Sequence, residues 1–590
     1  MKPEPLISDE PGDHNASNGI GIIEPQSPNA SSPGNQPWAH LLLHWHFVVL
    51  LAVIVFFGAI RWRLLDMPLE RDEGEYAYAG QLILQGIPPY QLAYNMKLPG
   101  TYAAYAGIMA AFGQTARGIH LGLLLVNSVC VILLYLIAAR LFGSLAGLIA
   151  GASYGLLSTH QGVLGFAAHA THFVVLWALM GILLLWQAEE TDRVAFLFSS
   201  GSAFGVAFLM KQPGILFGAF AFCYLAVQCW PKNDHGWALL TKKLGIFLLG
   251  AAVPFAVTCA LLYRAGVFQA FWFWTFDYAR QYGAIESLSQ GWHFLSDNFS
   301  YLLRFAPWLW ILAAVGVASV FWDATVRRYA VFIFGLLGFS CAAVSLGLYF
   351  RPHYFVLMMP AVAILIAIAA TSSIRLLAGK YTSRWIHILP AIAFIAAWGL
   401  AVQRNADFYF RLTPVQASRM CYPSYPFAEA LPIADYLRQH TGPTDNIMVL
   451  GSEPEIYFYA QRHSASGYIY TYSLLEDQAY WQVMQKQIEQ EVEARQPAYV
   501  VFVNVFNSWG GKLDSPQAAA LSSWMDRYVA YSFEQVGIAE LSYPDPRYAN
   551  GFSDAVTVER DTQGPLYFWG DEAQGHRRPF FEVRIFKRKD

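Results

Sequence analysis

The sequence predicts an α-helical polytopic membrane domain followed by a small α/β domain. The chain has 590 residues, of which 56% are hydrophobic and 13% charged, and its mean hydropathy is +0.34. Soluble globular domains carry about 25% charged residues, so this composition indicates a membrane protein. The formal net charge is -3, and no long basic run could follow a phosphate backbone, which argues against nucleic acid as a partner.

The first 38 residues are rich in Pro, Gly, Asn and Ser and lack a basic segment of the kind that begins a signal peptide. We predict a disordered cytoplasmic tail there. Five of the six cysteines lie in or beside apolar runs, so the sequence does not indicate a disulfide framework.

Residues 39–403 contain the predicted membrane domain. About eleven stretches approach the roughly 20 apolar residues that a spanning helix needs. They are 46–65, 119–139, 143–158, 169–188, 195–210, 213–230, 245–264, 301–321, 329–349, 353–371 and 385–403.

Basic residues in alternate loops predict the orientation of these spans. One set of loops contains Arg140, Arg193, Lys232, Lys242, Lys243, Arg327, Arg328, Arg375, Lys380 and Arg384. Because cytoplasmic loops are enriched in Lys and Arg, this set should be cytoplasmic. The loop from 66 to 118 and everything after 403 should then face outward.

An acidic pair, Asp72 and Glu73, follows the first predicted span. Asp72-x-x-Glu75 also matches a capping box, in which acidic side chains meet the N-terminus of a helix. That helix should end before Gly86 and lie along the membrane interface. The local sequence leaves both a helix cap and a functional role open for Asp72.

Further ionisable residues fall at the same predicted outer face. They are Lys97, His169, His172, Lys211, Arg351 and His353. Each has an ordinary explanation by itself, because lysines at span ends extend to the interface and histidines commonly pack between helices. Together they form the inventory expected of a site for an anionic, membrane-anchored substrate.

Several motifs resemble a known family. RDEGEYAYAGQLILQGIPPY, NMKLPG, MKQPG and RPHYFVLMMP are similar to segments of GT-C type polytopic glycosyltransferases, in the group of the protein mannosyltransferases and lipid A aminoarabinose transferases. The resemblance covers about residues 45–405. It implies transfer of a sugar from a polyprenyl-phosphate carrier to an acceptor outside the cytoplasmic membrane, with Asp72 as the catalytic carboxylate and Lys97 as a ligand of the carrier phosphate.

The chemistry of glycosyl transfer gives the remaining residues roles. Asp72 would take the proton of the acceptor hydroxyl, while Glu73 orients the acceptor, positions Asp72 or helps to bind a metal. Lys97, Lys211 and Arg351 would offset the charge of the leaving phosphate, and a single displacement would invert the anomeric configuration.

The histidines leave the cofactor open. Where the family commonly carries another acidic residue, this chain reads GFAAHATHFVVL, with His169 and His172. These two residues, with His353 and Tyr354, are candidates to contact the substrate or a divalent metal.

Residues 404–590 read as an extracytoplasmic α/β domain. NIMVLG, SGYIYTY, AYVVFVNV and FFEVRIF are predicted strands, and EPEIYFYAQ and EDQAYWQVMQKQIEQEVEAR are predicted helices. No glycine-rich nucleotide motif accompanies them. The domain is expected to cover the membrane site, and its surface is a candidate for acceptor recognition.

The sequence therefore predicts an inverting glycosyltransferase of the cytoplasmic (inner) membrane that uses a polyprenyl-phosphate-linked sugar. Its acceptor would be a cell-envelope glycan, a lipid or a protein. The alternative is a transporter of lipid-linked sugars, which would be expected to place its polar residues near the bilayer midplane.

Overall fold

The computed structural model describes residues 37–231, 236–423, 425–510, 514–541, 566–574 and 582–589. The predicted N-terminal tail, residues 1–38, lies almost wholly outside this set. The described residues from His46 onward form one compact unit, to which the following description applies.

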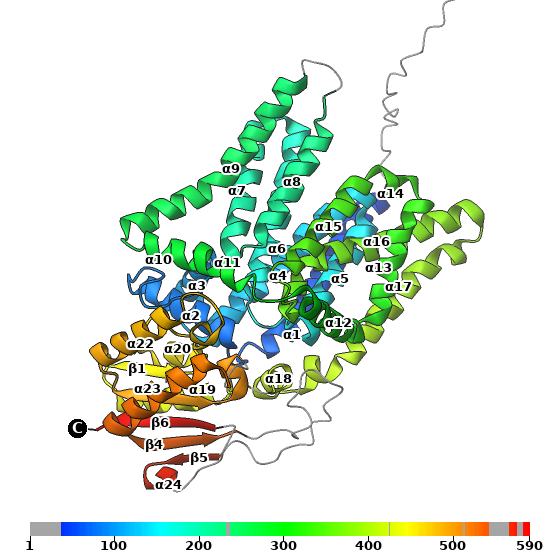
Figure 1. The fold of residues 1–590 in the computed structure, drawn as a ribbon. Coiled ribbons are helices and arrows are strands. Elements are labelled where there is room, and N and C mark those ends of the chain that lie inside the picture. The colour runs from blue at the N-terminus through cyan, green and yellow to red at the C-terminus, as the bar shows by residue number, and fades with distance from the viewer. Residues whose placement is uncertain are drawn as a thin grey trace, which may run out of the picture. The chain divides into compact units, whose positions relative to one another are not determined.

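Long apolar helices dominate the first two thirds of the chain (Figure 1). Among the described residues, six helices are long and apolar enough to cross a membrane, or seven if one bent pair is counted as a single span. The six are α1 (Pro37–Arg63), α4 (Ala116–Phe142), α6 (Ala170–Thr191), α9 (Gly236–Arg264), α16 (Met359–Lys380, extended by the 3₁₀ turn Pro352–Met358) and α17 (Arg384–Arg404). The chain is thus a multi-pass membrane protein.

Four shorter apolar helices occupy other predicted spans. They are α5 (Ser144–Leu157), α7 (Val194–Met210), α8 (Gly214–Gln228) and α15 (Ala330–Ser345). Helices therefore lie at every predicted stretch, although only some of them reach the full length of a span. Three short helices lie in the segments that connect the longer ones: α10 (Phe268–Trp272), α11 (Ala279–Tyr282) and α14 (Ala324–Arg328).

The predicted span 301–321 is wrong as a single helix. It is divided between α12 (Leu288–Phe305) and α13 (Pro307–Ala318), which meet at an angle of 106°. Pro307 cannot continue the hydrogen-bond ladder of α12, and Ala306 has left helical geometry with ψ at 50°.

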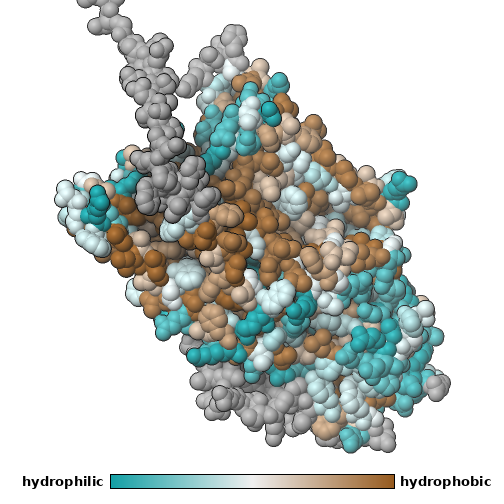
Figure 2. All heavy atoms as spheres, turned by 180° about the vertical axis from the view of Figure 1, so that it is seen from behind, coloured by the Kyte–Doolittle hydropathy of each residue, from teal (hydrophilic) through white to brown (hydrophobic). Residues whose placement is uncertain are grey.

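Helix α16 forms the centre of the membrane domain, packed against α5 and α13. Every residue in the most apolar 18-residue stretch of α16 is buried inside the protein. In α9 and α17, most residues of the corresponding stretch lie on the protein surface. Figure 2 shows apolar side chains gathered over the helical part and hydrophilic side chains gathered over the C-terminal part. Apolar surface on this scale fits a lipid environment.

Two described helices between α1 and α4 are not among those long and apolar enough to cross a membrane. Helices α2 (Arg71–Leu84) and α3 (Pro99–Phe112) are 14 residues each and pack against one another. Helix α2 ends before Gly86, as predicted, but its capping box was misplaced. Glu70 is the N-cap and Glu73 its partner, so Asp72 does not cap the helix.

The C-terminal part contains a mixed six-stranded sheet in the order β2-β1-β3-β6-β4-β5. The strands are β1 (Asn446–Leu450), β2 (His463–Ser464), β3 (Tyr499–Asn504), β4 (Phe533–Glu540), β5 (Leu566–Trp569) and β6 (Glu582–Arg588). Strands β2, β1 and β3 run parallel, and β6, β4 and β5 are joined by antiparallel pairing. The helices are α18 (Pro414–Cys421), α19 (Ala430–His440), α20 (Glu455–Ala460), α21 (Tyr472–Leu475), α22 (Trp481–Arg495), α23 (Pro516–Ser532) and α24 (Asp571–Gln574).

Most predicted elements of this part are present. Strands β1, β3 and β6 and helices α20 and α22 lie where the sequence predicts them. The predicted strand SGYIYTY is wrong, because these residues form a buried irregular segment beside α2 rather than part of the sheet. Helix α23 and strand β4 were not predicted. No glycine, proline or asparagine marks a turn between them, because β4 begins at the residue that follows α23.

Helix α20 packs directly on α2 and joins the two parts of the molecule. A Cβ at Gly74 would lie 2.5 Å from the backbone nitrogen of Glu455, so only glycine permits this approach. Arg71 strengthens the contact, since it donates to the carbonyl of Ser452 at 2.7 Å and pairs with the buried Glu453 at 3.3 Å. The C-terminal part therefore fixes the start of α2.

Candidate active site

The first turn of α2 places Asp72 beside Lys97. The Lys97 Nζ lies 2.7 Å from Asp72 Oδ1, 3.4 Å from Glu75 Oε2 and 3.1 Å from the Tyr76 hydroxyl. The side chains of Asp72 and Lys97 are 16% and 15% exposed, so water reaches both while most of each is enclosed. This is the ion pair between the two residues that the resemblance singled out.

The loop between α2 and α3 holds Lys97 in place. The Tyr90 hydroxyl donates to the carbonyl of Lys97 at 2.7 Å. Gln212, in the turn between α7 and α8, donates to the carbonyl of Met96 at 2.7 Å, and Thr101 donates to that of Met210 at 2.7 Å. These bonds tie the loop carrying Lys97 to the turn carrying Lys211.

The environment separates the acidic groups of α2. Burial opposes the charge of Asp72, but the charge of Lys97, its hydrogen bond and the nearby Lys211 outweigh it and hold the pKa of Asp72 far below the usual range. Burial raises the pKa of Glu75, and burial with the charges of Asp72 and Glu73 raises the pKa of Glu70. Of these three carboxyl groups, Asp72 is therefore the one whose ionised form is favoured, and such a separation is typical of sites with assigned acid and base roles.

Glu73 points away from this ion pair. Its Oε1 accepts from the backbone nitrogen of Ala168 at 2.6 Å and lies 3.0 Å from His120 Nε2, while its Oε2 closes the capping box with Glu70. The side chain is buried, 1% exposed. Glu73 thus joins α2, α4 and the loop before α6, and it positions His169, the residue that follows Ala168.

Two stacked histidines stand on the other side of Asp72. The rings of His169 and His353 are parallel within 13°, with centroids 4.0 Å apart, and a nitrogen of each lies 3.8 Å from Asp72 Oδ2. Burial lowers the pKa of His169 to about 4, against the opposing charges of Asp72 and Glu73. A neutral imidazole therefore faces the carboxylate.

Lys211 and Arg351 supply further positive charge. The Lys211 Nζ stands 4.1 Å above the centroid of the Tyr354 ring and makes a cation–π contact with it. Lys211 forms no ion pair among the described residues. Arg351 is exposed, donates to the Tyr282 hydroxyl at 3.2 Å and stacks over Tyr349. Both cations are available to an anionic ligand.

His172 does not belong to the cluster. It lies three residues further into α6, is fully buried, and neither ring nitrogen has a hydrogen-bond partner among the described residues. The predicted i, i+3 pair of histidines is therefore divided, since only His169 faces Asp72.

Tyrosines that were not predicted as site residues surround the ion pair. Tyr76 and Tyr282 contact Lys97 and Arg351, and Tyr470 from the C-terminal part donates to the carbonyl of Arg71 at 3.0 Å. Burial raises the pKa of Tyr472, and the charge of Lys97 opposes part of that rise. Tyr470 and Tyr472 lie within the segment SGYIYTY that was predicted to be a strand, and Tyr76 lies within the quoted motif RDEGEYAYAGQLILQGIPPY.

Three side chains of this cluster could also hold a metal. Asp72, His169 and His353 each offer a ligand atom, all within 4.8 Å of one another. Neither nitrogen of His169 has a hydrogen-bond partner among the described residues. One carboxylate and two imidazoles with an open position suit a divalent ion such as Zn²⁺, and direct contact with substrate uses the same atoms.

Comparisons with known proteins show which family and which solved structures the chain resembles. A profile of the family described as Dolichyl-phosphate-mannose-protein mannosyltransferase matches residues 97–253, the segment from Lys97 through Lys211 into α9. The match confirms the predicted resemblance to GT-C type glycosyltransferases. No curated protein sequence matches the chain.

The fold is similar to that of a solved structure. ArnT from Cupriavidus metallidurans bound to undecaprenyl phosphate is 17% identical, with a TM-score of 0.51 over 85% of this chain and 96% of that one. The archaeal oligosaccharyltransferase AglB from Archaeoglobus fulgidus, in complex with an inhibitory peptide and a dolichol-phosphate, is 12% identical, with a TM-score of 0.48 over 85% of this chain and 74% of that one. The likeness to ArnT confirms the predicted architecture, a polytopic helical domain followed by a small sheet-containing domain.

Proposed function

We propose that this protein is an inverting glycosyltransferase that moves a sugar from a polyprenyl-phosphate donor to an extracytoplasmic acceptor. The observation that carries the proposal is the Asp72–Lys97 ion pair at 2.7 Å, flanked by Lys211 and Arg351. A carboxylate kept ionised beside several cations is suited to a reaction in which a hydroxyl loses a proton and a phosphate leaves.

The chemistry divides between these two kinds of group. Asp72 accepts the proton of the acceptor hydroxyl while the oxygen of that hydroxyl forms a bond to the anomeric carbon of the sugar. The bond between that carbon and the phosphate oxygen breaks, and its electron pair stays with the phosphate. Lys97, Lys211 and Arg351 stabilise the charge that develops there, the arginine being able to contact two oxygens at once.

The remaining side chains have supporting roles in this proposal. Glu73 positions the loop of His169 rather than taking part in the proton transfer. His169 and His353 contact the acceptor or hold a divalent ion with Asp72, and Tyr354 supports Lys211. A bound ion would supply charge for the leaving phosphate or for the acceptor oxygen. His172 supports the packing of α6 beneath them.

The proposal includes a location. The site would face outward from the cytoplasmic (inner) membrane, with residues 39–403 as the transferase domain and residues 404–590 as an extracytoplasmic domain that closes over it. The positions of the basic residues support this orientation. Arg140, Lys380 and Arg384 stand at the ends of α4, α16 and α17 that are remote from Asp72.

Its expected partners are a polyprenyl-phosphate-linked sugar, membrane lipids and an acceptor that is a cell-envelope glycan, a lipid or a protein. ArnT has been captured with undecaprenyl phosphate and AglB with a dolichol-phosphate. The three motif cations Lys97, Lys211 and Arg351 would hold the phosphate of the same class of carrier here.

Transfer with purified protein tests the proposal. Detergent-solubilised enzyme is incubated with a radiolabelled polyprenyl-phosphate sugar and with glycan, lipid and peptide acceptors. A new glycosidic bond formed without vesicles supports the transferase. Movement of the labelled lipid between leaflets of a vesicle with no new bond would establish the alternative, a transporter, and overturn the proposal.

A further inference from the structure

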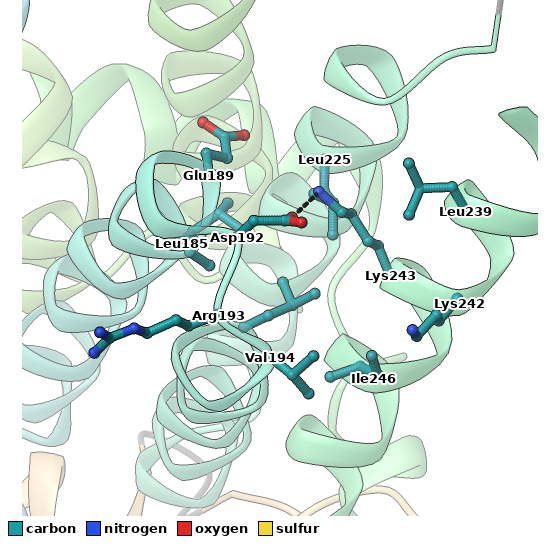
Figure 3. Close-up of a pocket in the computed structure, with 12 residues that line it drawn as sticks. Leu185, Glu189, Asp192, Arg193, Val194, Leu225, Leu239, Lys242, Lys243 and Ile246 are labelled. Carbon is teal, nitrogen blue, oxygen red and sulfur yellow. Dashed lines mark hydrogen bonds and ion pairs between the residues drawn. The ribbon is translucent and has the colours of Figure 1, made fainter.

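A second site lies at the other end of α6. Four helix ends meet there around a cavity of about 120 Å³, and Leu185, Leu197 and Leu225 form its inner wall (Figure 3). All three leucines are buried, so the inner wall is apolar. The charged residues Asp192, Lys242 and Lys243 stand at the mouth, and Glu189 and Arg193 also line the cavity.

This cavity is remote from the candidate active site. His169 begins α6 and Asp192 ends it, and the 22 residues between them span about 33 Å at 1.5 Å per residue. That length matches the roughly 30 Å hydrocarbon core of a bilayer. The cavity therefore opens at the membrane face opposite to Asp72.

Aromatic side chains mark the depth of the cavity. Trp230, just after α8, and Trp237, in the first turn of α9, are 62% and 48% exposed and meet edge to face with centroids 5.4 Å apart. Exposed tryptophans of this kind gather where hydrocarbon gives way to head groups. The mouth of the cavity is thus at head-group level.

The cations at the mouth are arranged to meet an anion from the membrane. Lys243 lies 2.8 Å from Asp192, whose side chain is 79% exposed, and Lys242 has no ion-pair partner among the described residues. In Figure 3 the Lys243 side chain reaches across to Asp192, whereas Arg193 points away from α9. An exposed ion pair of this kind is weak, so a phosphate can replace Asp192 on Lys243.

We propose that this cavity binds the head group of an anionic phospholipid from the leaflet opposite to the active site. The phosphate contacts Lys242 and Lys243, and an acyl chain lies along the apolar surface of Leu239 and Ile246 on α9. The occupant is a lipid rather than free phosphate, because the apolar wall of the cavity lies next to the lysines at its mouth, at the surface of the membrane. The site is independent of the proposed glycosyl transfer.

Lipid retention measured by native mass spectrometry tests the site. The full chain is purified from detergent with phosphatidylglycerol or phosphatidylcholine added. We expect selective retention of phosphatidylglycerol, weakened roughly fivefold by each of Lys242→Ala and Lys243→Ala, since one cation near a membrane surface contributes about that much. Asp192→Asn should strengthen retention, because it removes the competing carboxylate.

The matched control is Lys380→Ala, which removes one exposed lysine from the same membrane face at the end of α16. Equal loss in this control would reduce the effect to general surface charge and overturn the site. Equal retention of the two lipids would do the same. Displacement of phosphatidylglycerol by inorganic phosphate alone would identify a soluble-anion site instead. If a lysine-to-alanine variant fails to fold, Asp192→Asn still gives a directional test.

Discussion

The Lys97 ammonium lies 2.7 Å from Asp72 Oδ1, and the same nitrogen is 3.4 Å from Glu75. This ion pair is what holds the pKa of Asp72 low, so the carboxylate is charged but weakly basic before the donor binds. A donor phosphate that attracts Lys97 would relieve that effect and strengthen Asp72 as a base. Binding of the donor and activation of the acceptor would then be coupled through one lysine.

The variant Asp72→Asn should lose transfer while keeping its fold. Asn cannot accept the acceptor proton, and we expect kcat/KM to fall by about 10²-fold or more. The cap of α2 is Glu70, and Lys97 keeps Glu75 as a partner, so the melting temperature should change little. Transfer kinetics and thermal unfolding, measured together, check both statements.

Asp66→Asn is the matched control. It removes a carboxylate 2.7 Å from Arg117, in an exposed pair that lies shortly before α2 in the chain. Its activity should stay near that of the unmodified protein. A folded Asp72→Asn protein that retains near-normal transfer would refute the assignment of Asp72 as the base.

Removing Lys97 should alter both donor binding and the pH profile. In Lys97→Ala, we expect a raised KM for the donor, and an acid limb of the kcat/KM profile that moves to higher pH. The shift is upward because the first opposing charge that lowers the pKa of Asp72 is then missing. Lys97→Arg restores the positive charge but not the length and shape of the lysine side chain. It should therefore restore the pH of the acid limb more fully than the KM for the donor. An acid limb unchanged in Lys97→Ala would contradict the coupling.

Most of the helices could be predicted from apolar runs, because the length of a span is a local signal. The roles of Asp72 and Lys97 were expected from the family resemblance, since the local sequence left the role of each open. The direction of Glu73 could not be predicted, since it depends on Ala168 and on His120, more than 45 residues away. The same is true of Tyr470, which donates to the carbonyl of Arg71, 399 residues away in the chain.

Glu73→Gln separates positioning from chemistry. The carbonyl oxygen of Gln can still face Ala168 and His120, but its NH2 group cannot accept from the Glu70 backbone nitrogen as Oε2 does, and we expect a loss of about 1–3 kcal/mol in the free energy of unfolding. Transfer should fall in parallel with stability as His169 loses its support. Full stability with abolished transfer would instead place Glu73 in the reaction itself. Thermal unfolding and transfer assays on the same preparation distinguish the two outcomes.

Reporter fusions test the proposed orientation. A reporter active only outside the cytoplasm, fused after residue 430, should be active, because the domain after 403 and the loop of Asp72 are proposed to share one side. A cytoplasmic reporter fused within the loop before α17, near Lys380, gives the complementary control. Activity of the cytoplasmic reporter after residue 430 would reverse the orientation.

Lys211 should make donor binding sensitive to pH near neutrality. Burial, with the charge of Lys97, lowers the pKa of Lys211 to about 7, so in the free protein its charge is present below that pH and lost as the pH rises through it. A neutral Lys211 cannot attract the donor phosphate, and we expect the KM for the donor to rise between about pH 7 and 9. Lys211→Arg keeps its charge throughout this range and should flatten the dependence. Steady-state kinetics at saturating acceptor over this range give the measurement, and a pH dependence that survives unchanged in Lys211→Arg would assign it to another group.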